Sequence, residues 1–156
     1  MAITVEIDLG YEFEVKAPFK DVFDVLSDVP TSASFFPKVD QLVDLGNNTY
    51  RWEMEKVGTP QVNIQTIYAS KYKADKAKGT VTWTPVKGEG NALVGGSWKI
   101  TDNKKSTALQ FKVNGTVDVP LPGLMKALVA PVVKGEFEKL VEKYIDNLIK
   151  RFGGEV

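Results

Sequence analysis

The chain has 156 residues, in which 20 Lys and Arg balance 20 Asp and Glu, and it contains neither Cys nor His. This length suits one domain, and a neutral chain has no net field that would attract nucleic acid. Without Cys there are no disulfides, thiolate metal sites or Cys nucleophiles, and without His the commonest general base and metal ligand are missing. We therefore expect one domain over residues 1–156, with no metal, no cofactor and no nucleic-acid partner.

The first segment predicts a strand followed directly by a helix. Apolar and mostly charged side chains alternate over residues 3–16, as in an antiparallel strand with one face in water. After Pro18 the spacing becomes that of an amphipathic helix, with apolar residues at Phe19, Val22, Phe23 and Leu26. The pair Val29-Pro30 should end this helix, and a second short helix is expected in the following TSASFF segment.

The central part of the chain predicts six further strands, near residues 39–45, 49–56, 61–72, 80–86, 94–101 and 108–119. The segments between them are rich in Gly, Asn, Asp and Lys, which favour turns. Alternation places one set of side chains on the inward face: Tyr50, Trp52, Met54, Val62, Ile64, Thr66, Tyr68, Val81, Trp83, Trp98, Ile100, Leu109, Phe111, Val113, Val117 and Val119. Ile67 points outward in this pattern, which indicates a bulge or an error in the register.

The last thirty residues predict a long helix. Apolar residues at helical spacing run from Leu124 to Phe152, and the opposite face carries Lys and Glu. Pro131 lies inside this pattern and is expected to kink the helix or split it into two pieces. The sequence therefore predicts an α+β fold in which seven antiparallel strands pack against one long C-terminal helix.

This order of elements resembles the helix-grip fold of the START-like (SRPBCC) superfamily. The segment FEVKAPFKDVFDVLSDVPTSASFFPKV is similar to the start of its polyketide cyclase/dehydrase and lipid-transport-like members. GGSWKIT followed by STALQFKV resembles the late hairpin of the family. The resemblance implies a single ligand-binding domain in which a curved seven-stranded sheet wraps around the long helix, with two short helices after the first strand. It also implies an apolar cavity for lipids, sterols, quinones or polyketides, to which some members add catalytic residues.

Large inward side chains and the start of the final helix form the candidate ligand site. Trp and Met offer large, adaptable apolar surface, and Trp keeps one hydrogen-bond donor. We expect the ligand to contact Tyr50, Trp52, Met54, Thr66, Tyr68, Trp83, Trp98, Phe111, Leu124, Met125, Leu128 and Val132. A plain hydrophobic core would produce the same pattern. An empty void of roughly 300 Å³ would cost about 7 kcal/mol, so we expect a cavity to be wet, partly collapsed or occupied.

Hairpin alternation gathers the loops at two ends of the sheet. The turns KADKAKG and DNKKS form a lysine-rich end, whereas VGTP, KGEGNALVGG and VPLPGLM form a Gly/Pro-rich end that carries Leu93, Leu121 and Leu124. Gly-rich connections move easily, and apolar residues at a mobile rim suit an apolar ligand. We expect the cavity to open at the Gly/Pro-rich end, although ordinary loops over a core edge would have the same composition.

The inward face of the predicted strands lacks acid–base residues. It contains no Asp, Glu, His, Cys or Arg, and its polar groups are Tyr11, Tyr50, Thr66 and Tyr68. Glu53 and Glu55 alternate with Trp52 and Met54 and therefore fall on the solvent face. This pattern favours a protein that binds and carries or sequesters an apolar or amphipathic small molecule, with no catalytic residue.

Two other functions stay open. A cyclase or dehydratase could act on a polyketide-like substrate through the cavity tyrosines. Alternatively, the lysine-rich end could dock on a membrane surface or a partner protein, which would make the chain an accessory module. The N-terminal segment MAITVEIDLG carries acids where a signal peptide carries basic residues, so we expect a cytoplasmic protein; the residues leave its oligomeric state open.

Overall fold

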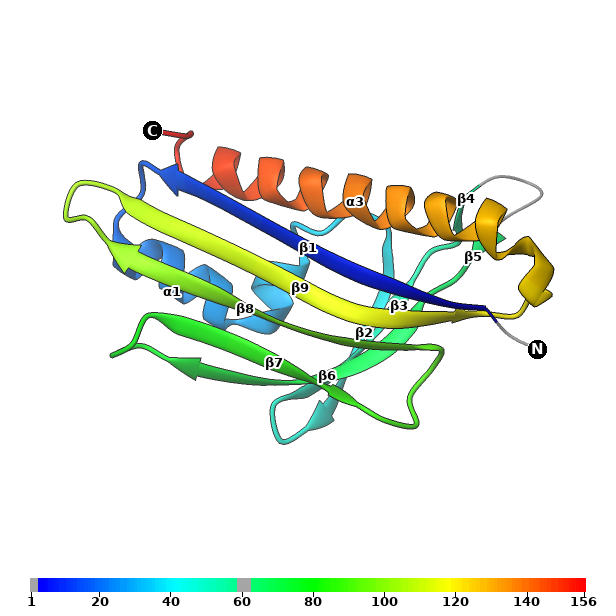
Figure 1. Cartoon of the computed structure of the whole chain (residues 1–156). Helices are drawn as coiled ribbons and strands as arrows, with labels where there is room; N and C mark the ends of the chain where they lie inside the picture. The colour runs from blue at the N-terminus through cyan, green and yellow to red at the C-terminus, as the bar shows by residue number, and fades with distance from the viewer. Residues whose placement is uncertain (1–2, 59–62) are drawn as a thin grey trace.

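The alternating segments pair into one curved antiparallel sheet, with strand order β1-β9-β8-β7-β6-β3-β2 (Figure 1). The computed structural model describes residues 3–58 and 63–156. The strands of this sheet are Ile3–Val15 (β1), Val39–Gly46 (β2), Thr49–Met54 (β3), Ile67–Asp75 (β6), Thr80–Val86 (β7), Ala92–Asp102 (β8) and Thr107–Val119 (β9). Val57–Gly58 (β4) and Asn63–Ile64 (β5) form a separate antiparallel pair. The predicted seven-stranded sheet with its long C-terminal helix is confirmed.

The region predicted as one strand over 61–72 is interrupted in the structure. It contributes β5 and β6, with two residues between them outside any strand, and Val62 lies outside the described residues. Ile64 and Thr66 are nevertheless buried, as the alternation predicted. Ile67 does face away from the cavity side, but it pairs with Glu53 at the end of a β3–β6 register that shows no shift, so neither a bulge nor a register error explains it.

The loop over residues 87–91 explains the outward position of Ile67. Asn91 Oδ1 accepts a hydrogen bond from the Ile67 amide at 2.8 Å, and the Asn91 amide donates to the Ile67 carbonyl at 2.9 Å. Asn91 Nδ2 also donates to the Gln65 carbonyl at 2.9 Å. A Cβ on Gly90 would overlap the Ile67 backbone, which shows how closely the loop covers this residue. An outward apolar residue is therefore half-buried by a loop.

Two short helices follow β1: Phe19–Ser27 (α1) and Val29–Ala33 (α2). The apolar face of α1 is buried, as the spacing after Pro18 predicted. The predicted position of the second helix was wrong by two residues, because it begins at Val29 and not within TSASFF. Pro30 starts this helix instead of preceding it, since a proline in the first helical turn sacrifices no intrahelical hydrogen bond.

The C-terminal helix is preceded by the 3₁₀ turn Gly123–Met125 (η1) and runs without interruption over Lys126–Arg151 (α3). Pro131 does not split it, so that alternative was wrong. The proline is the sixth residue of the helix, where the loss of one early backbone hydrogen bond is tolerated. The helix lies along the open side of the sheet (Figure 1) and buries one face, made of Val129, Val133, Leu140, Val141, Tyr144, Ile145 and Leu148.

We expect Leu148→Ala to lower the free energy of unfolding by about 2–5 kcal/mol, because the Leu148 side chain is fully buried and its removal leaves a void. Leu124→Ala is the matched control on a residue that is 97% exposed, and it should change stability by no more than about 0.5 kcal/mol. Urea unfolding followed by far-UV circular dichroism measures both. Equal effects for the two variants would contradict this packing of α3.

Candidate ligand-binding cavity

A cavity lies between the concave face of the sheet and helices α1, α2 and α3. Its volume is about 80 Å³, counted over the positions that the centre of a water molecule can occupy. One water molecule needs roughly 10–15 Å³, so the cavity can hold water, but a drug-sized ligand typically occupies a pocket of about 300–1,000 Å³. This small volume agrees with the expectation of a wet or partly collapsed site, and a larger ligand requires the walls to move.

Nearly half of the residues in the cavity wall are aromatic, and the described lining carries no charge. Valine, leucine and isoleucine side chains from the sheet, α1 and α2 fill the spaces between the rings. The aromatic lining consists of Phe36, Trp52, Tyr68, Tyr72, Trp83, Trp98, Phe111, Phe137 and Tyr144. The rings contact one another. Trp52 stacks on Tyr68 with ring centroids 5.8 Å apart, and the ring centroids of Trp98 and Phe111 are 4.6 Å apart. A wall of this kind favours an apolar occupant.

The structure brings five of the twelve predicted ligand-binding residues into this lining: Trp52, Tyr68, Trp83, Trp98 and Phe111. Three others lie on the strands or their ends but outside the cavity wall. Tyr50 packs edge-on against Tyr72, with centroids 6.0 Å apart. Met54 and Thr66 are buried in the core. Alternation thus identified the correct face of the sheet but not the part of it that surrounds the empty space.

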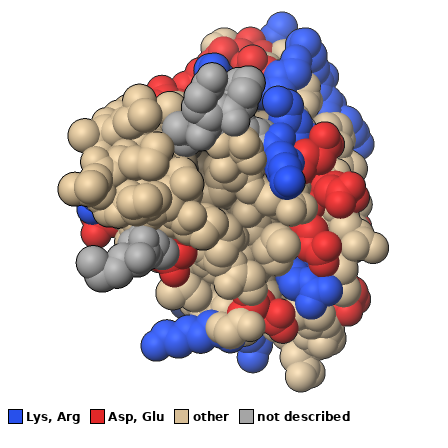
Figure 2. Space-filling model, turned by 90° about the vertical axis from the view of Figure 1, so that its right-hand side faces the viewer, with Lys and Arg blue, Asp and Glu red and all other residues tan. Residues whose placement is uncertain are grey.

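The four predicted residues on the final helix and its leading turn also lie outside the cavity wall. Leu124 is 97% exposed and Leu128 is 58% exposed, while Met125 and Val132 are partly buried and pack against a core cluster that shares Ile7, Val94 and Val117 with the cavity wall. Figure 2 shows a broad uncharged area on the face of the molecule where α3 begins. The described lining includes no residue of 87–93 or 120–125, although Val94 and Val117 lie close to these loops. Part of the predicted Gly/Pro-rich end, residues 59–60, lies outside the described residues, so a mouth at this end stays a prediction.

Several lining residues were missed by the sequence reasoning. Tyr72 follows Tyr68 by two further steps of the same alternation, so extending the pattern along β6 would have found it. Phe137 and Tyr144 were recognised only as part of the apolar stripe of α3. Ser32 and Phe36 gave no signal, because their place in the wall depends on how α2 turns back toward α3.

Three tyrosine hydroxyls are among the polar groups of the cavity lining, which also includes Ser32, Asn114 and Thr116. The Tyr72 hydroxyl accepts a hydrogen bond from Trp52 Nε1 at 2.9 Å, and the Tyr144 and Ser32 hydroxyls are hydrogen-bonded at 2.5 Å. The Tyr68 hydroxyl has no hydrogen-bond partner among the described residues. Tyr68 lines the cavity and is only half-buried, so its phenol is partly accessible. It is therefore a polar group that a bound ligand can use.

Burial keeps these hydroxyls protonated. It raises the pKa of Tyr144 to about 12, although the neighbouring Ser32 hydroxyl and Trp98 indole lower it in part. Burial is also the main cause that raises the pKa of Tyr68 and of Tyr72 above the ordinary value of 10.0, and the negative charge of another ionised tyrosine adds to it. At neutral pH the cavity contains neutral hydrogen-bond donors and disfavours negative charge.

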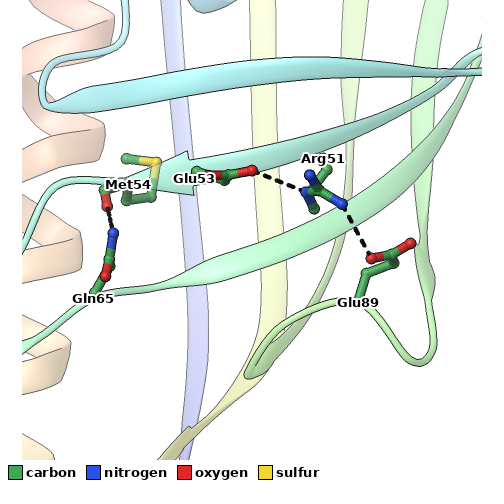
Figure 3. Close-up of polar contacts among 5 residues, drawn as sticks. All are labelled: Arg51, Glu53, Met54, Gln65 and Glu89. Atoms are coloured by element: carbon green, nitrogen blue, oxygen red, sulfur yellow. Dashed lines mark hydrogen bonds and ion pairs between the residues drawn. The ribbon is translucent and has the colours of Figure 1, made fainter.

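The carboxylate of Glu53 lies on the opposite, convex face. Arg51 Nε contacts Glu53 Oε2 at 3.0 Å, and its guanidinium also lies 3.6 Å from Glu89 Oε2, as Figure 3 shows. On the neighbouring segment, Gln65 Nε2 donates to the Met54 carbonyl at 3.1 Å. The Arg51–Glu89 contact connects β3 to the loop over 87–91, and the Gln65–Met54 contact connects β3 to the segment that precedes β6. Glu53 is thus part of a surface network and faces away from the cavity, and Glu55 is exposed.

Residues 3–58 and 63–156 contain no group of three or more acidic side chains placed to hold a metal ion. No helix in the described part of the chain is both long enough and apolar enough to span a bilayer.

Comparison with known proteins identifies the family. A sequence model described as polyketide cyclase/dehydrase and lipid transport matches residues 6–151. The chain belongs to this family. The START-like superfamily predicted from the sequence is thereby confirmed. Members of the polyketide cyclase/dehydrase and lipid transport family fit two roles, hydrophobic-ligand binding and polyketide cyclization, and this chain shares the fold that serves both. No curated protein matches the sequence.

Solved structures with this fold are distant in sequence from this member of the polyketide cyclase/dehydrase and lipid transport family. A START superfamily protein from Mycobacterium smegmatis superimposes with a TM-score of 0.67 at 17% identity, covering 94% of this chain and 97% of the other. ZhuI aromatase/cyclase from a Streptomyces species gives a TM-score of 0.61 at 16% identity, covering 93% of this chain and 90% of ZhuI. The protein TTHA0849 from Thermus thermophilus gives a TM-score of 0.67 at 15% identity, covering 93% of this chain and 96% of TTHA0849. At these identities the likeness shows the fold alone.

We expect the free energy of unfolding to fall as the pH rises from about 10 to 12. In the unfolded chain tyrosine ionises near 10.0, whereas the folded protein keeps Tyr144 protonated up to a pKa of about 12. The unfolded state therefore loses this proton first, and Tyr144 contributes stability that is complete below pH 10 and lost above it. One such residue accounts for at most about 1.4 kcal/mol per pH unit.

Urea unfolding midpoints at about pH 9, 10 and 11 measure this dependence. Tyr144→Phe should unfold with a shallower dependence on alkaline pH than the parent protein, whatever its stability at neutral pH. A variant that follows the parent slope would show that Tyr144 is not shielded as described.

Proposed function

We propose that this protein binds an apolar or amphipathic small molecule, such as a lipid, quinone or polyketide-like compound, and carries or sequesters it in the cavity between the sheet and α3. The observation that supports this most directly is the cavity wall, which is aromatic, uncharged and open enough to admit water. A cavity that is merely a packing defect would be expected to be smaller and to lack polar groups directed into it. The family to which the chain belongs supports the same class of ligand.

A cyclase or dehydratase is the alternative enzymatic function. Its support is the group of tyrosines in the cavity, since a phenol can donate to a ketone oxygen and orient an enol. Acid–base catalysis also needs a group that titrates near neutral pH, whereas the cavity tyrosines have a raised pKa and no carboxylate or amine is among the described lining residues. The described residues thus favour binding without chemistry, and we propose no catalytic residue.

The second alternative, docking on a membrane or a partner protein, has weaker support. The lysines of the β6–β7 and β8–β9 turns are exposed, as solvated turns usually are. A single ligand-binding domain in the cytoplasm remains our proposal for the organisation and location of the chain.

Binding is tested by narrowing the cavity. Val113 lines the wall and Val132 does not, so Val113→Phe and Val132→Phe add the same atoms inside and outside the proposed site. N-phenyl-1-naphthylamine, a neutral apolar probe, should bind the parent protein saturably and change its tryptophan fluorescence. Val113→Phe should weaken this binding by about tenfold or more, because the probe loses the space that the new ring occupies. Val132→Phe should leave binding within about threefold of the parent.

Thermal unfolding of both variants provides the control, since overpacking typically costs about 1–3 kcal/mol. The proposal fails if the parent protein does not bind the probe at concentrations where it is folded. It also fails if the two variants lose affinity equally, because the probe would then bind outside the cavity.

A further inference from the structure

We propose that the cavity selects neutral ligands that carry a hydrogen-bond-accepting oxygen, such as the carbonyl of a ketone or quinone, and that the Tyr68 hydroxyl donates the hydrogen bond. This inference rests on the proposed function and adds to it the chemical class of the ligand. It assigns to Tyr68 a role in specificity, distinct from the apolar surface that the neighbouring rings supply.

Tyr68 has the least engaged hydroxyl of the three phenols. The Tyr144 hydroxyl is already paired with Ser32, and the Tyr72 hydroxyl accepts from Trp52, while its own proton has no acceptor among the described residues. Tyr68 alone of the three has a hydroxyl without a partner among the described residues, and its ring is held by stacking on Trp52 at 5.8 Å with an interplanar angle of 11°. A donor on a fixed ring that reaches accessible space is a preorganised site for an acceptor oxygen. Leaving it unpaired on binding an oxygen-free ligand would cost affinity.

The described cavity wall contains no cationic side chain, and this disfavours a negatively charged ligand. No Lys or Arg is among the described lining residues, so a bound carboxylate would lose its hydration without gaining an ion pair. Burial in the same environment raises the pKa of all three tyrosines, which agrees with a site that disfavours negative charge. A free fatty acid in its ionised form should therefore bind less well than a neutral ketone of the same size.

Three naphthalenes of nearly identical shape separate these contributions. 2-Acetylnaphthalene is neutral and has the acceptor oxygen, 2-isopropenylnaphthalene replaces that oxygen by a CH₂ group, and 2-naphthoate is an anion. A purely apolar cavity would bind the isopropenyl compound most tightly, because it is the most hydrophobic of the three. We expect the ketone to bind at least as tightly as the isopropenyl compound, and the naphthoate to bind about tenfold or more weakly at neutral pH. Isothermal titration calorimetry measures all three.

The variant Tyr68→Phe tests the donor, since it keeps the stacked ring and removes only the hydroxyl. It should weaken binding of 2-acetylnaphthalene by roughly 3- to 10-fold, the usual range for one neutral hydrogen bond, and leave 2-isopropenylnaphthalene unchanged or tighter. Tyr50→Phe is the matched control, because Tyr50 is a tyrosine of β3 that lies outside the cavity wall. It should alter none of the three affinities.

The outcomes distinguish this inference from the proposed function. Suppose that the isopropenyl compound binds the parent protein more tightly than the ketone and that Tyr68→Phe affects both alike. The cavity then binds ligands, but the role of Tyr68 as hydrogen-bond donor to the ligand is refuted. If the naphthoate binds most tightly, the neutral class is refuted, and this comparison needs only the parent protein. If none of the three compounds binds, the proposed function itself is overturned.

Discussion

The curvature of the sheet is the constraint on which the remaining structure depends, and two glycines permit it. A Cβ on Gly96 would lie 2.7 Å from the Trp83 ring and would overlap the Lys112 carbonyl oxygen, and a Cβ on Gly115 would overlap the Leu93 carbonyl oxygen. No side chain fits at either position without moving the backbone. Such close backbone approaches are typical of a bend in a sheet, and Trp83 and Gly115 line the cavity between the bent sheet and the helices.

The distribution of charge follows from this geometry. The concave face has only the space between the sheet and the helices, where an isolated charge would be desolvated, so its polar groups are neutral hydroxyls with raised pKa values. The convex face is in contact with water, and there Arg51 can pair with both Glu53 and Glu89 at little desolvation cost. One sheet thus separates an uncharged interior from a polar exterior.

The sequence predicted the face of each strand better than it predicted the site. Trp52 and Met54 both point inward, as their alternation with Glu53 indicated, yet only Trp52 touches the cavity. Leu124 was assigned to the ligand because it is apolar and begins a helical stripe, but it stands almost fully exposed beyond the end of the sheet. Apolar character and periodicity specify a face of an element; they contain no information about the distance to the opposite wall.

The amino-acid sequence by itself determined the order of the elements, the antiparallel sheet and its apolar face, because strand and helix periodicities are local and appear within a few residues. It also determined that no Cys or His could take part in any chemistry. Only the tertiary structure decided where packing is incomplete. Ser32 and Phe36 meet Tyr144, 112 and 108 positions away, only after α2 folds back on α3. A cavity is what remains when such distant segments fail to fill the space between them, so its position depends on all of them together.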